Sequence, residues 1–263
     1  MASADLATPG RIWLLGIPVD RVDRDAARAW IHSALLADDG RCRHVVTLNP
    51  EYAIAARRDP GFGAAVRSGD LIVADGVGIV LAARLHARTE RAGLGRVTGV
   101  ELVEWLTADS GPLEAPLFLL GAKPGVGAAA AARLQALRPH ARIAGWWGGG
   151  SPSPIHDAAT LERIRESGAR AVVVAYGAQG QIAWIVRNRD ALAAAGVRLA
   201  IGVGGALDYH AGVADLPPAI VRRAGFEWLW RLLREPWRWK RQLALPLFAA
   251  LALREAGKRR AGR

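Results

Sequence analysis

The sequence has little of what stabilises a small secreted domain or a membrane-spanning chain. Its 263 residues include one cysteine, Cys42, so neither an internal disulfide nor a cysteine-based structural zinc site can form. The longest apolar run, residues 243–253, has eleven residues and contains Pro246, whereas a helix that crosses a bilayer needs about 20. The first residues show no leader of the kind that directs secretion. We therefore expect a chain that stays inside the cell and does not cross a membrane.

Motifs for common cofactors and metals are also missing. There is no P-loop, no G-x-S-x-G sequence and no H-x-H or H-x-x-x-H pair among the six histidines, so we expect no metal site and no cofactor. Asp23-Arg24-Asp25 has a D-x-D spacing that can hold a metal bound to a nucleotide diphosphate. The same residues begin a predicted helix, where aspartate is favoured by the helix dipole, and we adopt that interpretation.

The apolar residues that are present follow a clear pattern. They make up 51% of the chain, which permits a sizeable core and excludes a disordered protein. Continuous apolar runs alternate with helical segments, which predicts an α/β fold with a largely parallel, Rossmann-like sheet and helices on both faces. The expected strands are residues 12–19, 44–48, 71–74, 116–120, 142–146, 171–176 and 197–203. The expected helices are residues 24–36, 51–57, 60–67, 77–85, 99–107, 128–137, 156–166 and 181–189.

Positive charge is concentrated at the C-terminal end. The formal net charge is +11, and residues 222–263 hold twelve Lys and Arg but three Glu, so they carry nine of these charges. From about residue 218 the pattern is helical only and rich in Trp and Arg. We predict a core at residues 1–215 and a helical, basic, Trp-rich appendage at residues 216–263. Such an excess of positive charge indicates a polyanionic partner.

The pattern within the appendage favours a membrane surface as that partner. Arg231, Arg238 and Arg241 are spaced to share one helix face with Arg234, unless Pro236 begins a second helix, and Trp237 lies among them. Short helices that combine Arg, Trp and apolar residues are typical of chains that lie on anionic membranes. An ordinary solvated surface helix is the simpler alternative. A nucleic-acid partner is not expected, because the tail is too apolar and no nucleic-acid-binding motif is found.

Polar residues follow several predicted strands, where α/β sheets bind their ligands. Thr47 and Asn49 could hydrogen-bond a phosphate or sugar, or Asn49 could cap the next helix. Asp75 and Gly76 follow another strand. Asp75 could be a general base for a hydroxyl group, with Gly76 letting a ligand approach the backbone, or it could be a helix cap.

Two further strands end in glycine-rich segments. The amide of Gln181, after the strand at 171–176, could bind a sugar or a base, and the alternative is a glycine turn that opens a helix. Gly204 and Gly205 could bring the backbone close to a phosphate. They lack the G-x-G-x-x-G spacing of a dinucleotide-binding loop, so we do not expect a dinucleotide there.

Taken together, these segments resemble the WecG/TagA/CpsF family of bacterial glycosyltransferases over residues 12–245. The matching segments, in chain order, are Thr47-x-Asn49-Pro50-Glu51, Asp75-Gly76-x-Gly78, Arg96-Val97-Thr98-Gly99-x-Glu101, Leu119-Leu120-Gly121-Ala122-Lys123-Pro124-Gly125, residues 177–185, Gly202-Val203-Gly204-Gly205, and Glu227-Trp228-x-x-Arg231-x-x-x-Glu235-Pro236-x-Arg238. No one segment is decisive, but seven in the right order are specific.

The resemblance implies a function and roles for several residues. The family moves a sugar from a UDP-sugar to a polyprenyl-diphosphate-linked sugar, with inversion and without a metal. It implies that Asp75 is the general base and that Thr47 and Asn49 line the same pocket. Arg96 and Gln181 would contact phosphate or sugar. The lipid diphosphate would meet the appendage arginines, among Arg231, Arg238 and Arg241.

One segment departs from the family pattern. Many members read Gly-x-Pro-Lys-Gln-Glu where this chain reads Gly177-Ala178-Gln179-Gly180-Gln181-Ile182. The expected donor is therefore UDP-N-acetylmannosamine or the UDP derivative of another hexose such as glucose. We expect a peripheral protein at the cytoplasmic face of the inner membrane, with a homo-oligomer as a second way to bury the appendage. The alternative function is a non-catalytic, membrane-associated protein that binds a UDP-sugar or a glycolipid.

Overall fold

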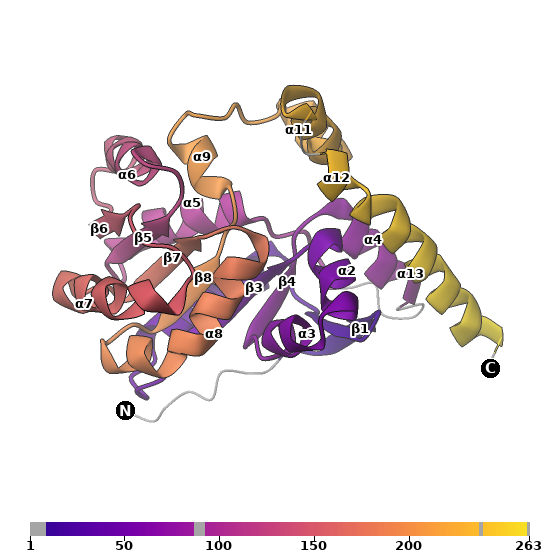
Figure 1. Cartoon of the computed structure of the whole chain (residues 1–263), viewed down its shortest axis with the longest axis horizontal. Helices are drawn as coiled ribbons and strands as arrows, with labels where there is room; N and C mark the ends of the chain where they lie inside the picture. Colours follow the sequence, from indigo (N-terminus) through magenta and orange to yellow (C-terminus); the bar gives the residue numbers. More distant parts are fainter. Residues whose placement is uncertain (1–8, 87–92, 237–238, 262–263) are drawn as a thin grey trace.

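The computed structural model describes residues 9–86, 93–236 and 239–261, which contain a parallel sheet of six strands in the order β4-β3-β8-β7-β5-β6 (Figure 1). The predicted α/β class and the parallel sheet are confirmed. Neighbouring strands pair in parallel throughout this sheet. Its strands are β3 (Arg43–Leu48), β4 (Leu71–Ala74), β5 (Leu117–Gly121), β6 (Ile143–Trp147), β7 (Ala171–Ala175) and β8 (Leu199–Gly202).

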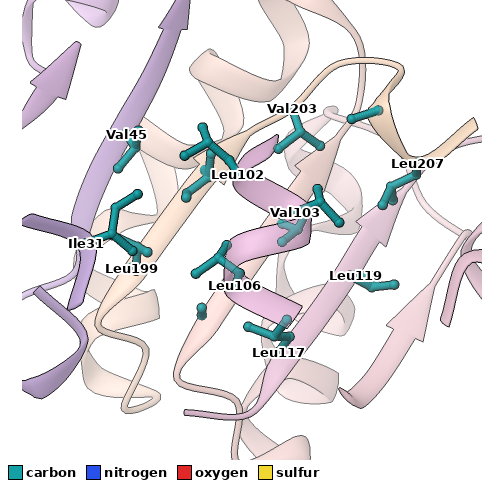
Figure 2. Packing of buried hydrophobic residues seen from close by; sticks show 14 of the residues in the cluster. Ile31, Val45, Leu102, Val103, Leu106, Leu117, Leu119, Leu199, Val203 and Leu207 are labelled. Carbon is teal, nitrogen blue, oxygen red and sulfur yellow. The ribbon is translucent and has the colours of Figure 1, made fainter. Parts of the chain in front are cut away.

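Helices cover both faces of the sheet, as predicted. One face packs against α1 (Arg24–Leu36), α5 (Gly99–Ser110), α6 (Val126–Leu137) and α9 (Ala206–His210). Figure 2 shows Leu102, Val103 and Leu106 of α5 directed at the strands, where all three are buried. The other face packs against α2 (Pro50–Arg58), α3 (Pro60–Arg67), α4 (Val77–His86), α7 (Asp157–Ser167) and α8 (Ala178–Ala194), with a short 3-10 turn, η1 (Pro154–His156), before α7.

The single strand expected at residues 12–19 is wrong. The segment is a hairpin of two antiparallel strands, β1 (Arg11–Leu14) and β2 (Ile17–Asp20). Leu15 and Gly16 form the turn with φ of 51° and 81°, and positive φ at both turn residues suits a two-residue hairpin. The buried Asp20 carboxylate accepts a hydrogen bond of 2.6 Å from the backbone of Ile72, which fixes the hairpin beside β4.

The C-terminal helices return to the core. They are α10 (Ala219–Ala224), α11 (Glu227–Arg234), α12 (Trp239–Gln242) and α13 (Ala244–Ala261). In α13, Phe248, Ala252 and Ala256 are buried at a spacing of four residues, and the helix packs on α2 and α4 (Figure 1). Part of the apolar run at 243–253 therefore faces the core. Within the described residues, no helix combines the length and the apolar character needed to cross a bilayer.

Candidate active site

A cavity of about 560 Å³ opens at the carboxyl ends of the parallel strands. Its walls come from the residues that follow β3, β4, β5, β7 and β8, together with α10, α11 and α12 of the C-terminal segment. Eight of the residues singled out from the sequence line it: Thr47, Asn49, Asp75, Arg96, Gln181, Gly204, Gly205 and Arg231. Gly76 does not line it. The topology thus gathers residues that are up to 184 positions apart in the sequence into one site.

Asp75 stands at the last rung of the ladder between β3 and β4. Its backbone N–H donates to the Leu48 carbonyl at 2.7 Å. An isolated parallel bridge then joins Ala74 to Arg96, which brings the Arg96 backbone beside the end of β4. No described residue donates a hydrogen bond to the Asp75 carboxylate, so the capping interpretation of Asp75 receives no support. The neighbouring Gly76 has a φ of 113°, which favours glycine at the sharp turn into α4.

The surroundings of Asp75 favour its protonated form. Burial is the largest cause and the negative charge of Glu227 is the next, and together they raise the pKa of Asp75 to about 7. Arg96 and Arg231 act in the opposite direction. A carboxyl group that changes its charge near neutral pH is suited to accept a proton from a hydroxyl group.

Arg96 and Glu227 form the main polar link between the sheet and α11. The two terminal nitrogens of Arg96 donate to the two carboxylate oxygens of Glu227 at 2.6 and 3.1 Å. Arg96 was expected from the resemblance to contact phosphate or sugar. In this structure its guanidinium is paired with a carboxylate of the protein itself. Burial raises the pKa of Glu227, while Arg96 opposes that increase.

Thr47 and Asn49 combine a structural contact with a place in the cavity wall. The Thr47 hydroxyl donates to the Gly202 carbonyl at 2.9 Å and ties β3 to β8. The Asn49 side-chain oxygen accepts from the Tyr52 N–H at 3.0 Å, so the helix-cap interpretation of Asn49 is confirmed. Its amide nitrogen has no hydrogen-bond partner among the described residues and remains available for a ligand.

Gln181 is buried and holds the far wall of the cavity in place. Its nitrogen donates to the Tyr52 hydroxyl at 2.6 Å, and its oxygen accepts from the Gly204 N–H at 2.9 Å. A Cβ atom at Gly202 would lie 2.8 Å from the same side chain, so only glycine fits there. The Gln181 amide therefore positions the glycine loop after β8, in addition to lining the cavity.

Arg231 brings a positive charge from α11 into the cavity. Its guanidinium lies 5.1 Å above the Tyr209 ring, 4.0 Å from the Asp208 carboxylate and 3.7 Å from the Glu235 carboxylate. Its Nε and Nη2 atoms are buried and donate no hydrogen bond within the described residues. A Cβ atom at Gly205 would lie 2.8 Å from Nη2, so Gly205 makes room for Arg231. Buried donors without acceptors favour an anionic ligand.

Several residues of the cavity wall were given no role on the basis of the sequence, although Lys123 and Glu227 stand in segments that resemble the family. Tyr52, Lys123, Tyr176, Arg222 and Glu227 all line it. Lys123 follows β5 in the segment 119–125, and the rule that ligands bind at strand ends could have identified it. Glu227 and Arg222 come from the C-terminal helices, and no local pattern in the sequence predicts how these helices dock.

Four other residues singled out from the sequence are not among the described residues that line the cavity. Trp237 and Arg238 lie outside the described residues, and so does the side chain of Arg241. Asp23 accepts a hydrogen bond from the Ala26 N–H and caps α1, in agreement with the helix-start interpretation. Among the described side chains, no group of three His, Cys, Asp or Glu residues is arranged to hold a metal ion.

Comparisons with known proteins agree with this geometry. The model of the glycosyl transferase WecG/TagA/CpsF family matches residues 12–262. An N-acetylglucosaminyldiphosphoundecaprenol N-acetyl-beta-D-mannosaminyltransferase of Bacillus subtilis (strain 168) is 30% identical over 212 residues, which cover 80% of this chain and 79% of that protein. A protein of the same name from Bacillus spizizenii is 29% identical over 218 residues, which cover 82% of this chain and 81% of that protein. The family match includes the sheet, the cavity and most of the C-terminal segment.

Proposed function

This chain belongs to the glycosyl transferase WecG/TagA/CpsF family, and on that premise we propose that it transfers a sugar from a UDP-sugar to a sugar linked to a polyprenyl diphosphate. The names of the two Bacillus relatives describe an acceptor of that kind, which supports a lipid-linked acceptor for this glycosyltransferase. The observation that carries the proposed mechanism is the half-buried Asp75, whose pKa is raised to about 7 in a cavity that also contains Arg231.

In the proposed reaction Asp75 is the general base. Its carboxylate accepts the proton of an acceptor hydroxyl while the hydroxyl oxygen bonds to the anomeric carbon of the donor sugar. The bond from that carbon to the UDP oxygen breaks, and UDP leaves with the electron pair. Attack opposite the leaving group inverts the anomeric centre. A base with a pKa near the working pH is partly ionised and still basic enough to take the proton.

The departing diphosphate needs positive charge near it. Arg231 supports this role because its buried Nε and Nη2 atoms make no hydrogen bond within the described residues, and the carboxylates of Glu235 and Asp208 stay 3.7 and 4.0 Å away from them. Lys123 lines the same cavity from the end of β5. Positive donors in a site partly closed to water stabilise developing negative charge more strongly than they would in bulk solvent. We infer that these side chains, and not a metal ion, balance the charge on UDP.

Two observations bear on the identity of the donor sugar. The relatives' names support N-acetylmannosamine, whereas the altered segment at 177–182 supports another hexose such as glucose. Ile182 is buried in the core, and a Cβ atom at Gly180 would lie 2.8 Å from Pro152. This backbone therefore leaves no room for a long charged side chain at either position, and sugar selection must depend on other contacts.

We further propose that the C-terminal helices bring the enzyme to the cytoplasmic face of the inner membrane as a peripheral protein. The support is a group of exposed large apolar residues between α10 and α13: Ile220, Phe226, Trp228, Leu229, Leu233, Trp239, Leu243 and Leu247. They occur in the segment that holds most of the net positive charge. Apolar and basic side chains together suit an anionic bilayer surface, where a polyprenyl-linked acceptor resides.

The decisive experiment measures UDP release. Wild type and Asp75→Asn are incubated with UDP-N-acetylmannosamine or UDP-glucose, with and without a short-chain polyprenyl-diphosphate sugar. We expect acceptor-dependent release with one donor and a loss of at least ~10²-fold in Asp75→Asn, the scale of a positioned general base. Asp190→Asn is the matched control, since Asp190 is exposed on α8.

The other outcomes separate the alternatives. Full activity of Asp75→Asn would remove the assignment of the base. UDP binding without release for any donor would instead favour the non-catalytic binding protein. A titration with UDP alone, performed on the same samples, supplies the binding measurement that this comparison needs.

A further inference from the structure

A second cavity, of about 510 Å³, adjoins the first. We call it the Arg84 cavity. The two cavities share Arg96, Glu101 and Arg222 in their walls. The residues that line the Arg84 cavity are Arg24, Val77, Val80, Arg84, Arg96, Glu101, Arg222 and Gly225. Arginine is thus the most common residue of this lining, and Glu101 is its one carboxylate.

Glu101 and Arg96 are already satisfied by other groups. One oxygen of Glu101 accepts from the backbone and hydroxyl of Thr98 at 2.9 and 3.0 Å, and the other lies 2.7 Å from Arg24. Arg96 makes its two contacts with Glu227. Glu101 therefore neutralises Arg24, and Glu227 neutralises Arg96. The lining holds no further carboxylate that could pair with its other two arginines.

Arg84 and Arg222 are those remaining arginines. Neither forms an ion pair with a described residue. The charge of Arg222 acts on Glu227, but both oxygens of that carboxylate already accept hydrogen bonds from Arg96. Arg84 donates to the Leu94 carbonyl at 3.5 Å, a long contact that leaves most of its donors unused. Both side chains are exposed. Two guanidinium groups that line one cavity without an ion pair offer several donors to an anion, and the oxygens of a phosphate ester match their fork of donors.

The location of the cavity relates it to the catalytic base. Its floor is α4, which begins at Val77, two residues after Asp75. Its other wall is the end of α10, where Gly225 is in the left-handed region with a φ of 77°. A Cβ atom at Gly225 would lie 2.7 Å from Val77, so α10 rests directly on α4. The two cavities therefore meet at their shared side chains, of which Arg96 and Glu101 lie close enough to act on the pKa of Asp75.

Exposed apolar side chains occur on the same two helices as the two unpaired arginines. Leu81 lies on α4 one turn before Arg84 and is 58% exposed, and Ile220 precedes Arg222 on α10 and is 77% exposed. Cationic side chains beside exposed apolar ones suit a ligand with a phosphate head and a hydrocarbon tail.

We propose that the Arg84 cavity binds the diphosphate of the lipid-linked acceptor. UDP then occupies the first cavity, the acceptor sugar lies at Asp75 between the two, and the hydrocarbon chain leaves past Leu81 and Ile220. The identity of the acceptor rests on the proposed function. The inference of a phosphate-bearing ligand rests on the placement of Arg84 and Arg222 in the cavity lining.

The first test measures binding without catalysis. Farnesyl diphosphate is titrated into the full-length protein in saturating UDP, so that the donor site is already filled. We expect Arg84→Gln and Arg222→Gln each to weaken farnesyl diphosphate binding by about 10-fold or more, the scale of a lost charged hydrogen bond. Arg84 does not line the first cavity, so the UDP affinity of Arg84→Gln should stay within about 2-fold of wild type. Arg138→Gln, which removes an exposed arginine after α6, should bind as wild type does. Wild-type affinity in Arg84→Gln and Arg222→Gln would overturn the proposal.

Kinetics separate this proposal from the proposed function. In an active enzyme, Arg84→Gln should raise the KM for the acceptor and leave kcat and the KM for the donor unchanged. Transfer with an unchanged acceptor KM would overturn the cavity assignment and leave the function intact. Absence of transfer with every donor, together with binding of farnesyl diphosphate that depends on Arg84, would overturn the function and support the cavity.

Vesicles distinguish the acceptor from bulk phospholipid. Phosphatidylglycerol vesicles without acceptor are sedimented with wild type and with the Arg84→Gln, Arg222→Gln double variant. We expect equal sedimentation of the two proteins. Loss of vesicle binding in the variant, with unchanged affinity for farnesyl diphosphate, would assign the cavity to a phospholipid headgroup and overturn the proposal.

Discussion

Arg96 and Glu227 lie 131 positions apart in the sequence and form a two-pronged ion pair at 2.6 and 3.1 Å. The pair joins the end of the sheet to α11. It also places opposite charges near Asp75, where Glu227 raises and Arg96 lowers the pKa of the base. The docking of the C-terminal helices and the protonation of the base are therefore coupled through one contact.

The pH dependence of activity should report this coupling. Because the base must be ionised and the pKa of Asp75 is about 7, kcat/KM should rise with pH through about 7 and fall below it. Glu227→Gln removes a negative charge and leaves Arg96 unpaired, and both changes lower the pKa of Asp75. The acid limb of the profile should therefore move to lower pH. Glu162→Gln, on the exposed surface of α7, should leave the limb unchanged. A limb that stays in place in Glu227→Gln would contradict the coupling.

Gly205→Ala tests the position of Arg231. The added methyl would lie 2.8 Å from Arg231 Nη2, so the flexible guanidinium must move while the backbone stays. We expect normal folding and a loss of UDP affinity of about 10-fold, the scale of one charged hydrogen bond. Gly257→Ala in α13 meets no atom within 4 Å and should keep full affinity, with a gain of about 0.5–1 kcal/mol in stability from helix propensity. UDP affinity equal to wild type in Gly205→Ala would show that the present position of Arg231 is not needed.

Sedimentation with anionic vesicles tests the membrane surface. Leu233→Ser with Trp239→Ser removes two exposed apolar side chains of α11 and α12. Each large side chain contributes about 1.5–3 kcal/mol when fully buried, so the double variant should lose at least about 10-fold in vesicle affinity. Leu137→Ser with Trp146→Ser makes the same change at the opposite edge of the sheet and should bind as wild type does. Equal losses in the two variants would argue against a membrane surface at α11 and α12.

His44 should make stability depend on pH. It is fully buried, its ring nitrogens lack hydrogen-bond partners, and burial with the nearby Arg189 lowers its pKa to about 4 despite the opposing charge of Asp70. In the unfolded chain the pKa is about 6.5, so only the unfolded state gains a proton between these values. The free energy of unfolding is therefore highest, as far as His44 is concerned, above pH 6.5. It decreases as the pH falls, by about 2 kcal/mol between pH 7 and pH 5.

Urea unfolding at the two pH values measures this effect. His44→Leu should show a smaller loss of stability between pH 7 and pH 5 than wild type, by about that amount. His156→Gln, at an exposed histidine, should keep the wild-type loss. An unchanged loss in His44→Leu would show that His44 does not carry the dependence.

Much of the fold could be predicted because parallel strands buried on both faces are continuous apolar runs. The helix at 60–67 and the strand at 71–74 have the predicted bounds. The hairpin of β1 and β2 was missed because Leu15 is apolar, so the apolar run continues through the turn. Leucine rarely adopts a positive φ, and its presence at this position therefore gives no sign of a turn. The short helix α9 has five residues, too few for a helical period to emerge.

The residues of the site that could be predicted are those that directly follow a strand of the parallel sheet. Thr47, Asp75 and Gly204 were singled out because they follow strands, and parallel strands end at one edge. Gln181 was expected to contact the ligand, and its two hydrogen bonds to Tyr52 and Gly204 could not be foreseen from spacing. Glu227 was quoted only as part of a motif, since its partner depends on how separate helices dock.

The attachment of α13 has a consequence for how the cavity can open. Phe248, Ala252 and Ala256 anchor this helix in the core, and Glu255 accepts from the Leu15 N–H at 2.9 Å. At its other end, α10 is pressed onto Val77. The wall that holds Arg231 is thus tethered on both sides, and a tethered group keeps a high effective concentration when its contacts break. Arg231 would therefore leave the cavity while α13 stays in the core and α10 stays on Val77. Ligand exchange should not require release of α13.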